Sequence, residues 1–579
     1  MRKEAKISKY LLQFFKLYDK IYMYMIFDQA VEFFDYGGFM EIIIKAVGAY
    51  FSADGVVADN VNHPQFAQYK VEQSENTYNL YATSQLAPAA VSLRIPVEIG
   101  TNDTIFMNGF QSATESREHT VHERMKGIDI VSSYARSLYA EKVGGDYSIV
   151  KYKNKPGVTH GFSYCYFRHG DRVRLFASLD ESTGYTVFKY DAWNSLLKVS
   201  KDIEGVKSFD NYKAMSLFFA EGTYDEVFDK WFEALGKSEN PPAPELVGYS
   251  TRKLDKIDES MIDCKLNAVK GCFPVKPNIF IVDGEYCVNG DWLKPNADKF
   301  PMGMRAVSDM IKGADVMSGL CISPFTASEK SQVYREHKDW VLTAPDGRPV
   351  TTKRNLYVLD SENPEVREHV RNVLHTILFM WGFNLAKLDN LYVAGMIPTD
   401  GKSRGERMCS AMAFLRECCG GKLMYADHTP LMPAFGKADY CAISCDAVSD
   451  LLPPAYSKRF CRESASVRNA SADIVFRRGL NGRAFLGAPC PVSLDNKESF
   501  LDGRLNNAEQ NVLTNLEGLF TSVRIIADTG ASYDQKKKRR FRKMCSLGSD
   551  AEGVKVQNAR DGFLVSYKFE GKSYIVKFR

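Results

Sequence analysis

The chain has 579 residues, which is too long for one hydrophobic core, so we expect two to four domains. Hydrophobic residues make up 45% and charged residues 25% of the sequence, which excludes a disordered or fibrous chain. The 75 basic and 71 acidic residues leave a net charge of only +4. The overall charge therefore gives no general attraction to nucleic acid or to an acidic membrane.

The cysteines and the N-terminus point to a cytoplasmic protein. Thirteen cysteines, an odd number at irregular spacing, argue against a disulfide framework and are interpreted as reduced thiols. No apolar stretch reaches the length of about 18 residues that a membrane-spanning helix needs. Charged residues interrupt the apolar stretch in residues 1–25, so we expect no signal peptide there. This segment is either an amphipathic helix or lies upstream of a true start at Met25.

Residues 1–240 are expected to form a mostly-β domain. Short aromatic and β-branched runs recur from residue 25 onward, separated by turn residues, and this rhythm predicts a β-sandwich. The clearest runs are residues 147–152, 161–167 and 185–190. A helix is expected at 223–236. The proline-rich segment 240–244 is a stiff, non-helical linker, which places the first domain boundary.

After the linker, short apolar runs alternate with long amphipathic segments. The expected strands are 246–251, 278–283, 315–324, 384–390, 422–427, 440–446, 484–488 and 519–527, and the clearest helices are 363–381, 404–419 and 507–518. Such alternation implies parallel strands, and eight such units predict a (β/α)8 TIM barrel over residues 245–530. Residues 531–579 are expected to form a linker helix and a small C-terminal β-domain with a hairpin turn at Glu570-Gly571.

Three aspartates fall at predicted strand ends, where the reacting groups of TIM barrels lie. They are Asp283, Asp389 and Asp446. Two carboxylates facing one pocket suit glycoside hydrolysis, in which one attacks the anomeric carbon and the other donates a proton. We expect Lys387, on the same strand face as Asp389, to keep that nucleophile ionised. Asp446 is expected to have a raised pKa, as a proton donor needs.

A collinear series of short motifs covers roughly residues 245–530. The motifs are Asp283-Gly284, Gly290-Asp291-Trp292, Pro295-Asn296, Lys299-Phe300-Pro301, Gly303-Met304, Gly319-Leu320, Pro324, His337 with Asp339-Trp340, Leu359-Asp360 with Asn363-Pro364, Lys387-Leu388-Asp389, Pro433-Ala434-Phe435-Gly436 with Asp439, and Asp446. In this order they resemble the barrel of glycoside hydrolase family 36, the microbial and plant α-galactosidases. The resemblance implies a retaining α-glycosidase with Asp389 as nucleophile and Asp446 as acid/base. It implies α-galactosides of the raffinose or melibiose type as substrates, and a reaction that needs no cofactor or metal.

Departures from the family pattern gather around the expected sugar pocket. They are Val282 and Glu285 in D-D-G-W, Tyr249-Ser250-Thr251-Arg252 in place of W-x-S-W, Ala426-Asp427-His428 in place of G-C-G, Ala442 in place of the Arg of R-I-G-P-D, and Gly487-Ala488-Pro489-Cys490 in place of N-D-P-D. The two aspartates that the resemblance makes catalytic are therefore retained, whereas the residues expected around the sugar differ from the family pattern. The expected substrate-binding residues are Asp283, Glu285, Lys387, His428 and Trp292, although each has a structural alternative, such as packing of Trp292 under a loop.

Several alternatives remain open. The pocket changes are compatible with another α-glycoside, with transfer to a sugar acceptor, or with a catalytically silent sugar-binding protein. The basic run 536–543 suggests nucleic-acid binding, although a solvated helix face explains it better. Cys441 and Cys445 are too far apart along a strand to share a zinc ion. The oligomeric state is open, and a homo-oligomer is possible.

Overall fold

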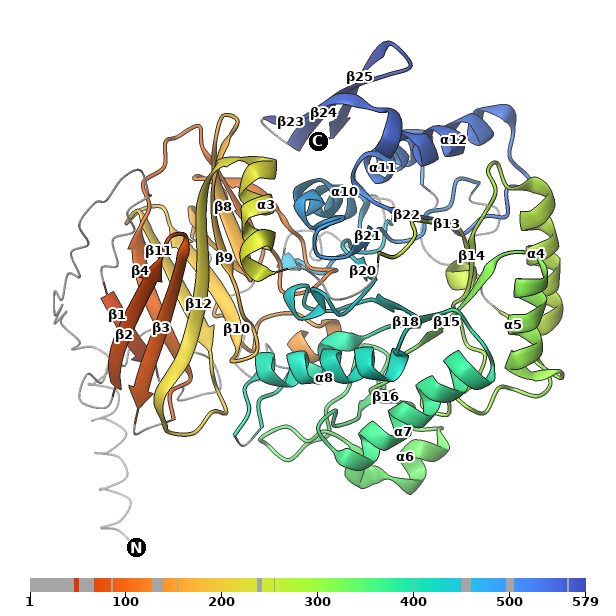
Figure 1. The fold of residues 1–579 in the computed structure, drawn as a ribbon, viewed down its shortest axis with the longest axis horizontal. Helices are drawn as coiled ribbons and strands as arrows, with labels where there is room; N and C mark the ends of the chain where they lie inside the picture. The colour runs from red at the N-terminus through yellow and green to blue at the C-terminus, as the bar shows by residue number, and fades with distance from the viewer. Residues whose placement is uncertain are drawn as a thin grey trace, which may run out of the picture.

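The computed structural model describes residues 46–50, 67–84, 87–127, 139–153, 155–236, 242–254, 256–399, 401–448, 460–495, 505–559 and 562–578. The predicted segment 1–25 lies outside these residues. In Figure 1 a layered pair of sheets lies beside a parallel barrel sheet, and a small blue sheet from the C-terminal end of the chain lies above them. The predicted architecture, a TIM barrel flanked by β-rich parts, is confirmed.

Two antiparallel sheets form the N-terminal sandwich. The first contains, in spatial order, β1 (Ala46–Tyr50), β4 (Ala90–Pro96), β11 (Leu196–Asp202), β10 (Tyr185–Asp191) and β7 (Val158–Phe162). The second contains β2 (Ala67–Ser74), β3 (Thr77–Ser84), β12 (Phe209–Thr223), β9 (Arg172–Ser178), β8 (Tyr164–His169), β5 (Thr104–Met107) and β6 (Arg117–Thr120). Every second residue of β3 is buried, as expected for a strand with one face on a core.

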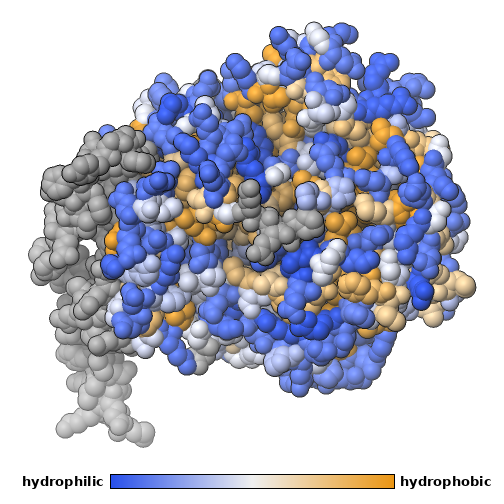
Figure 2. Space-filling model, viewed as in Figure 1, coloured by the Kyte–Doolittle hydropathy of each residue, from blue (hydrophilic) through white to orange (hydrophobic). Residues whose placement is uncertain are grey.

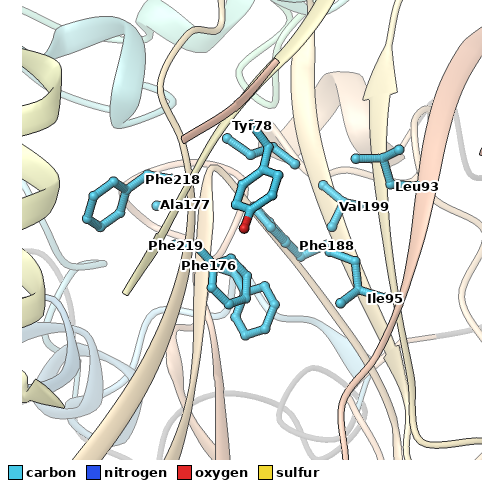
Figure 3. Close-up of a pocket in the computed structure, with 10 residues that line it drawn as sticks. Tyr78, Leu93, Ile95, Phe176, Ala177, Phe188, Val199, Phe218 and Phe219 are labelled. Carbon is cyan, nitrogen blue, oxygen red and sulfur yellow. The ribbon is translucent and has the colours of Figure 1, made fainter. Parts of the chain in front are cut away.

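The core of the sandwich is apolar and closely packed. Side chains from both sheets meet there, including Leu93, Phe188 and Val199 from one sheet and Tyr78 and Phe176 from the other (Figure 3). They leave a cavity of only about 10 Å³, with no polar surface. A space of that size without polar partners does not hold an ordered water molecule. This cavity is therefore a packing defect and not a ligand site.

The predicted strand at 147–152 is wrong. This segment forms turns, and its tyrosines are buried: Tyr147 and Tyr152 stack with ring centroids 4.3 Å apart. The Tyr152 hydroxyl donates to Asp146 at 2.6 Å. Buried aromatic side chains here pack a loop and not a sheet. The predicted run 161–167 is split at Ser163, whose φ is 65°, so its two halves belong to different sheets.

Eight parallel strands form the barrel, in the order in which they follow one another along the chain. They are β13 (Leu246–Ser250), β14 (Ile279–Val282), β15 (Met317–Ile322), β18 (Leu385–Leu388), β19 (Leu423–Ala426), β20 (Tyr440–Ala442), β21 (Leu486–Ala488) and β22 (Val523–Ile526). Beyond the end of β21, the Ala527 N–H donates to the Val492 carbonyl at 3.0 Å, which helps to close the ring. All eight predicted strands are present, but β20 is shorter than the prediction of 440–446. Asp446 therefore lies on the loop beyond β20.

Helices cover the outside of the barrel (Figure 1). Among the described residues between the linker and the last barrel strand, the α-helices are α4 (Glu259–Cys272), α5 (Gly303–Gly313), α6 (Gln332–Glu336), α7 (Pro364–His375), α8 (Arg404–Cys419), α10 (Val467–Phe476) and α11 (Asn507–Phe520). A two-stranded sheet of β16 (Thr326–Ala327) and β17 (Tyr357–Val358) follows β15. The start of α7 is set by Asn363, whose side chain accepts from the Glu365 N–H at 2.8 Å, with Pro364 as the first helical residue.

The C-terminal part packs on the barrel through a helix. This helix, α12 (Gln535–Asp550), carries the basic run and buries Phe541, Met544 and Leu547. Basic side chains of the run contact the protein itself: Arg540 donates to Gln510 at 2.8 Å and Lys543 to the Tyr567 hydroxyl at 2.9 Å. These contacts support a structural use of the run, and the surface at α12, at the upper right of the molecule, is hydrophilic (Figure 2).

The last strands are β23 (Glu552–Ala559), β24 (Gly562–Phe569) and β25 (Lys572–Phe578). They form one antiparallel sheet, and the predicted turn is present, with positive φ at Glu570 and Gly571. The sandwich ends in a further helix, α3 (Tyr224–Leu235), which confirms the helix expected at 223–236. Among the described residues, no helix is both long and apolar enough to cross a membrane.

Arg477 joins the sandwich to the barrel. It follows α10, its side chain is fully buried, and its guanidinium donates to three carbonyls of the sandwich loop 108–114 and to the Ile443 carbonyl just beyond β20. It also donates to the Asn108 side chain at 3.0 Å. Burial lowers the pKa of Arg477, whereas the carboxylate of Asp473 opposes this shift. One side chain thus holds the loop that carries Asp446 against the neighbouring domain.

Replacing Arg477 with Met is expected to destabilise the protein strongly. The variant leaves several buried carbonyls without their donor, a loss of about 3–5 kcal/mol. Thermal unfolding followed by circular dichroism measures the change, and we expect a fall in the midpoint of several degrees. The matched control is Arg305→Met, because the Arg305 side chain is 73% exposed on α5. Equal midpoints for the two variants would contradict the bridging role.

Candidate active site

Polar and charged side chains gather at the C-terminal ends of six of the eight barrel strands. They are Arg252 after β13, Asp283 after β14, Lys387 and Asp389 at the end of β18, Asp427 and His428 after β19, Asp446 after β20, and Cys490 after β21. The strands are parallel and neighbours in the sheet, so these side chains meet over the same mouth of the barrel.

Asp389 presents one carboxylate oxygen to the mouth of the barrel. Its Oδ1 accepts from the backbone N–H of Asn390 and from Nδ1 of His428, both at 2.7 Å. Asn390 has a left-handed backbone conformation, with φ 54°, and its side chain donates to Ser323 at 2.8 Å, which fixes this turn. No hydrogen bond from a described residue reaches Oδ2. One oxygen of Asp389 is therefore held in place while the other is available.

Asp446, like Asp389, has one carboxylate oxygen that accepts hydrogen bonds and one that accepts none from a described residue. Its Oδ1 accepts from Nη2 of Arg252 at 3.0 Å and from the thiol of Cys490 at 2.7 Å. No described residue contributes a hydrogen bond to its Oδ2, and the side chain is 38% exposed. Asp446 thus keeps one oxygen open to solvent at the barrel mouth.

A chain of ion pairs connects the two carboxylates. His428 Nδ1 lies 2.7 Å from Asp389 and 3.5 Å from Asp427, and Arg252 reaches from Asp427 at 3.1 Å to Asp446 at 3.0 Å. Asp389 and Asp446 are therefore joined through two cations and one shared carboxylate. These contacts place both carboxylates at one mouth of the barrel.

Lys387 plays a different part from the predicted one. Its Nζ lies 2.6 Å from Asp283 and 3.1 Å from Asp427, and its side chain is almost fully buried. The cation that contacts Asp389 is His428. The expectation that Lys387 holds Asp389 ionised is therefore corrected: strand alternation placed both side chains on one face, but the lysine turns to carboxylates on neighbouring strands.

The charges set the protonation states of the site. Burial raises the pKa of Asp389, but the neighbouring His428 outweighs it, so the net shift is downward. Burial lowers the pKa of His428, yet Asp389 and Asp427 raise it to about 9. Asp389 is thus a carboxylate and His428 an imidazolium at neutral pH.

The predicted raised pKa of Asp446 is wrong for this structure. Burial does push the pKa upward, but the charges of Arg252 and His428 and the hydrogen bond from Cys490 lower it well below its usual range, with Asp427 opposing them. The sequence argument relied on an apolar setting or a carboxylate neighbour. It did not foresee that the new residue at the end of β13 would reach this carboxylate.

The His428 pair predicts a pH dependence of stability. A histidine whose folded pKa is raised stabilises the fold fully below its unfolded pKa, near 6.5, and loses that contribution as pH rises through about 9. We expect His428→Gln to lower the free energy of unfolding by about 1–3 kcal/mol in mildly acidic buffer and by much less above pH 9. Denaturant unfolding across pH tests this, with exposed His122→Gln as control. A pH-independent difference would contradict the pair.

Two further predicted substrate-binding residues lie outside the ion-pair chain. Trp292 is only 8% exposed and packs against Tyr286, whose hydroxyl donates to its carbonyl at 3.0 Å, which favours the packing alternative over sugar stacking. Glu285 is exposed on the loop after β14, and no ion pair with a described residue ties it to the cluster. Asp283 and His428, in contrast, lie within the cluster.

Arg252, Asp427 and Cys490 were not predicted as site residues. Each occupies a position where the sequence departs from the family pattern, and that coincidence was the available signal. What the sequence lacked was their mutual contact, since the three residues come from strands far apart along the chain. The departures form one connected set of contacts around Asp446.

A metal is not needed to explain these contacts. One oxygen of Asp389, one of Asp427 and Nδ1 of His428 lie within 4.8 Å of one another, which is a possible cation-binding spacing. In this arrangement His428 pairs with Asp389, and Asp427 already pairs with Lys387 and Arg252. Cys441 and Cys445 are both buried, and their thiols donate to different backbone carbonyls.

Comparison with known proteins supports the family. The Melibiase family profile matches residues 283–415, which include Asp283 and Asp389 and end before Asp446. Probable α-galactosidase C of Aspergillus flavus is 35% identical over 128 residues, and α-galactosidase AgaA of Geobacillus stearothermophilus is 32% identical over 89 residues. These matches cover 18% and 15% of this chain and only 17% and 12% of the relatives.

Solved structures extend the likeness to almost the whole chain. TtGalA, the α-galactosidase of Thermus thermophilus, in complex with p-nitrophenyl α-D-galactopyranoside, has a TM-score of 0.66 at 20% identity, covering 88% of this chain and 96% of its own. AgaA of Geobacillus stearothermophilus, a family 36 enzyme, has a TM-score of 0.55 at 12% identity, covering 91% and 77%. At such identities the likeness concerns the fold. The chain thus contains a segment that matches the Melibiase family, within a fold that it shares with α-galactosidases of known structure.

Proposed function

We propose that the protein is a retaining glycoside hydrolase that cleaves a terminal α-linked sugar, with Asp389 as nucleophile and Asp446 as acid/base. One observation carries this proposal. Both carboxylates have Oδ1 fixed by hydrogen bonds while Oδ2 accepts none from a described residue, and both lie over one mouth of the barrel. Two such oxygens suit attack on one face of the anomeric carbon and proton transfer on the other.

The reaction has two steps. In the first, the Asp389 carboxylate attacks the anomeric carbon, the bond to the leaving oxygen breaks, and that oxygen takes the electron pair and the proton of Asp446. In the second, Asp446 removes a proton from water as the water attacks the same carbon. The ester bond to Asp389 then breaks, which restores its carboxylate and releases the sugar.

Asp283, held in place by Lys387, is proposed to bind a sugar hydroxyl beside the nucleophile. Lys387 pairs with Asp283 at 2.6 Å, and no described residue contributes a side-chain hydrogen bond to Oδ1 of Asp283. The Asp283 side chain remains 13% exposed, which leaves that oxygen room to accept from a hydroxyl. Asp283 is thus the part of this pair that faces the pocket.

α-Galactosides are the proposed substrates. Structural neighbours were solved with p-nitrophenyl α-D-galactopyranoside, stachyose and raffinose. A panel of p-nitrophenyl α-glycosides tests the proposal, with release of nitrophenolate as the readout. We expect the α-galactoside to be hydrolysed with retention of configuration, as seen by proton NMR of the first-formed sugar. Turnover of another sugar only would assign a related α-glycosidase, and a disaccharide product would indicate transfer. Binding without turnover would leave a silent sugar-binding protein.

The cytoplasm is the proposed location. All thirteen cysteines lie among the described residues, and none is in a disulfide. Reduced thiols in such number are typical of a reducing compartment.

A further inference from the structure

Arg252 connects Asp446, the proposed acid/base, to Asp427, the carboxylate beside His428. It follows β13 and stands where the family resemblance expects a tryptophan. Its Nη1 lies 3.1 Å from Asp427 and 3.9 Å from Asp283, and its Nη2 lies 3.0 Å from Asp446. Contacts on both ends fix the plane of the guanidinium. The Arg252 guanidinium therefore links Asp446, the proposed acid/base, to the buried carboxylate of Asp427.

The surroundings of Asp446 favour its carboxylate form. Arg252 and the thiol of Cys490 both donate to its Oδ1, and the His428 imidazolium adds a second positive charge. Asp427 is the opposing negative charge, and the neighbouring Cys445 is buried and donates to a carbonyl elsewhere. A proton donor in such a setting is held in the form that has no proton to give.

We propose that Arg252 is a specificity-determining positioning residue that restrains proton donation by Asp446. The enzyme therefore favours glycosides with an aryl leaving group over glycosides whose leaving group is another sugar. This inference rests on the proposed hydrolase function and deepens it, since it names the class of leaving group. It concerns a residue at which this chain departs from its family.

The ion pair with Arg252 affects the rates of the two steps of the reaction to different extents. A sugar leaving oxygen needs a proton from Asp446 as the glycosidic bond breaks, and the ion pair withholds it. A phenolic oxygen leaves with the electron pair as a stabilised phenolate and takes a proton from water afterwards. In the second step Asp446 acts as a base toward water and has to be a carboxylate, a form that the ion pair preserves although it weakens the base. Arg252 therefore slows most the step that needs an acid.

The first test compares two leaving groups on one sugar. The pH profiles of kcat/KM for melibiose and for p-nitrophenyl α-galactoside are measured for the wild type, Arg252→Gln, Arg252→Lys and the exposed control Arg305→Gln. In Arg252→Gln we expect the alkaline limb for melibiose to move up by about one pH unit or more, and the melibiose-to-aryl ratio to rise about tenfold. Arg252→Lys keeps the charge and is expected to stay near the wild type. A parallel loss for both substrates, with an unmoved limb, overturns the proposal.

A second test does not depend on turnover. Asp446 is 38% exposed, so a carbodiimide with an amine can modify its carboxylate, and peptide mass spectrometry reports the rate. We expect faster modification of Asp446 in Arg252→Gln than in the wild type, and no change in Arg305→Gln. Equal rates in all three proteins overturn the restraint by Arg252. Absence of wild-type turnover on every aryl α-glycoside refutes the hydrolase function and the leaving-group preference together, whatever the modification rates.

Discussion

Asp389→Asn is expected to reduce turnover of the aryl α-galactoside by about a thousandfold or more, because the amide is too weak a nucleophile to form the covalent intermediate. The substitution keeps the shape of the side chain, and its amide oxygen can still accept from the Asn390 N–H and from His428. Initial rates of nitrophenolate release under saturating substrate give the loss in kcat.

Asp309→Asn is the matched control, because it makes the same change on an exposed part of α5, where the side chain is 58% exposed. We expect wild-type rates from it. The thermal midpoint of Asp309→Asn should lie close to that of the wild type, whereas Asp389→Asn also loses the ion pair with His428 and should unfold at a lower temperature. Rates are therefore compared well below both midpoints, where each variant is folded. Retention of most activity in folded Asp389→Asn would rule out the assigned nucleophile.

Asp446→Asn is expected to separate the two steps of the reaction. Loss of general acid–base catalysis costs about 10²–10⁴-fold, and we expect a loss of this size for melibiose, whose leaving oxygen needs a proton. The loss for the aryl galactoside should be smaller in the first step, so that the covalent intermediate accumulates. A burst of nitrophenolate followed by a slow steady state is the expected signal.

Azide provides the diagnostic for Asp446. As an anionic nucleophile it needs no general base, so it can attack the intermediate in Asp446→Asn without help. We expect azide to accelerate the steady state of the variant and to yield a glycosyl azide with the α configuration of the substrate. It should leave the wild type nearly unchanged. An equal effect on both proteins, or loss of aryl and melibiose turnover in the same proportion, would exclude Asp446 as the acid/base.

The barrel could be predicted because its signals are local. Each strand is a short apolar run, and helices such as α8 (Arg404–Cys419) match the expected range residue for residue. The strand predicted at 147–152 failed because buried tyrosines in a loop at a domain junction carry the same aromatic signal as a strand. Strand 440–446 was overextended because its apolar residues continue into a buried loop.

The candidate site was predictable in part for a related reason. Asp389 and Asp446 follow strands of a parallel barrel, and that topology brings their side chains to one mouth. The protonation of Asp446 was not predictable, because it depends on Arg252, a residue almost two hundred positions away. A charged partner from another strand can reverse the direction of the pKa shift of a carboxyl group, and the residues next to that group in the sequence do not reveal it.

Local sequence was enough to predict the alternation of strands and helices, the order of the motifs and the positions of the two aspartates, since periodicity and capping depend on neighbours along the chain. Which cation contacts which carboxylate depends on the folded arrangement. Lys387 turned to Asp283, His428 to Asp389 and Arg252 to Asp446 because charges pair through space, at distances near 3 Å, whatever their separation in sequence.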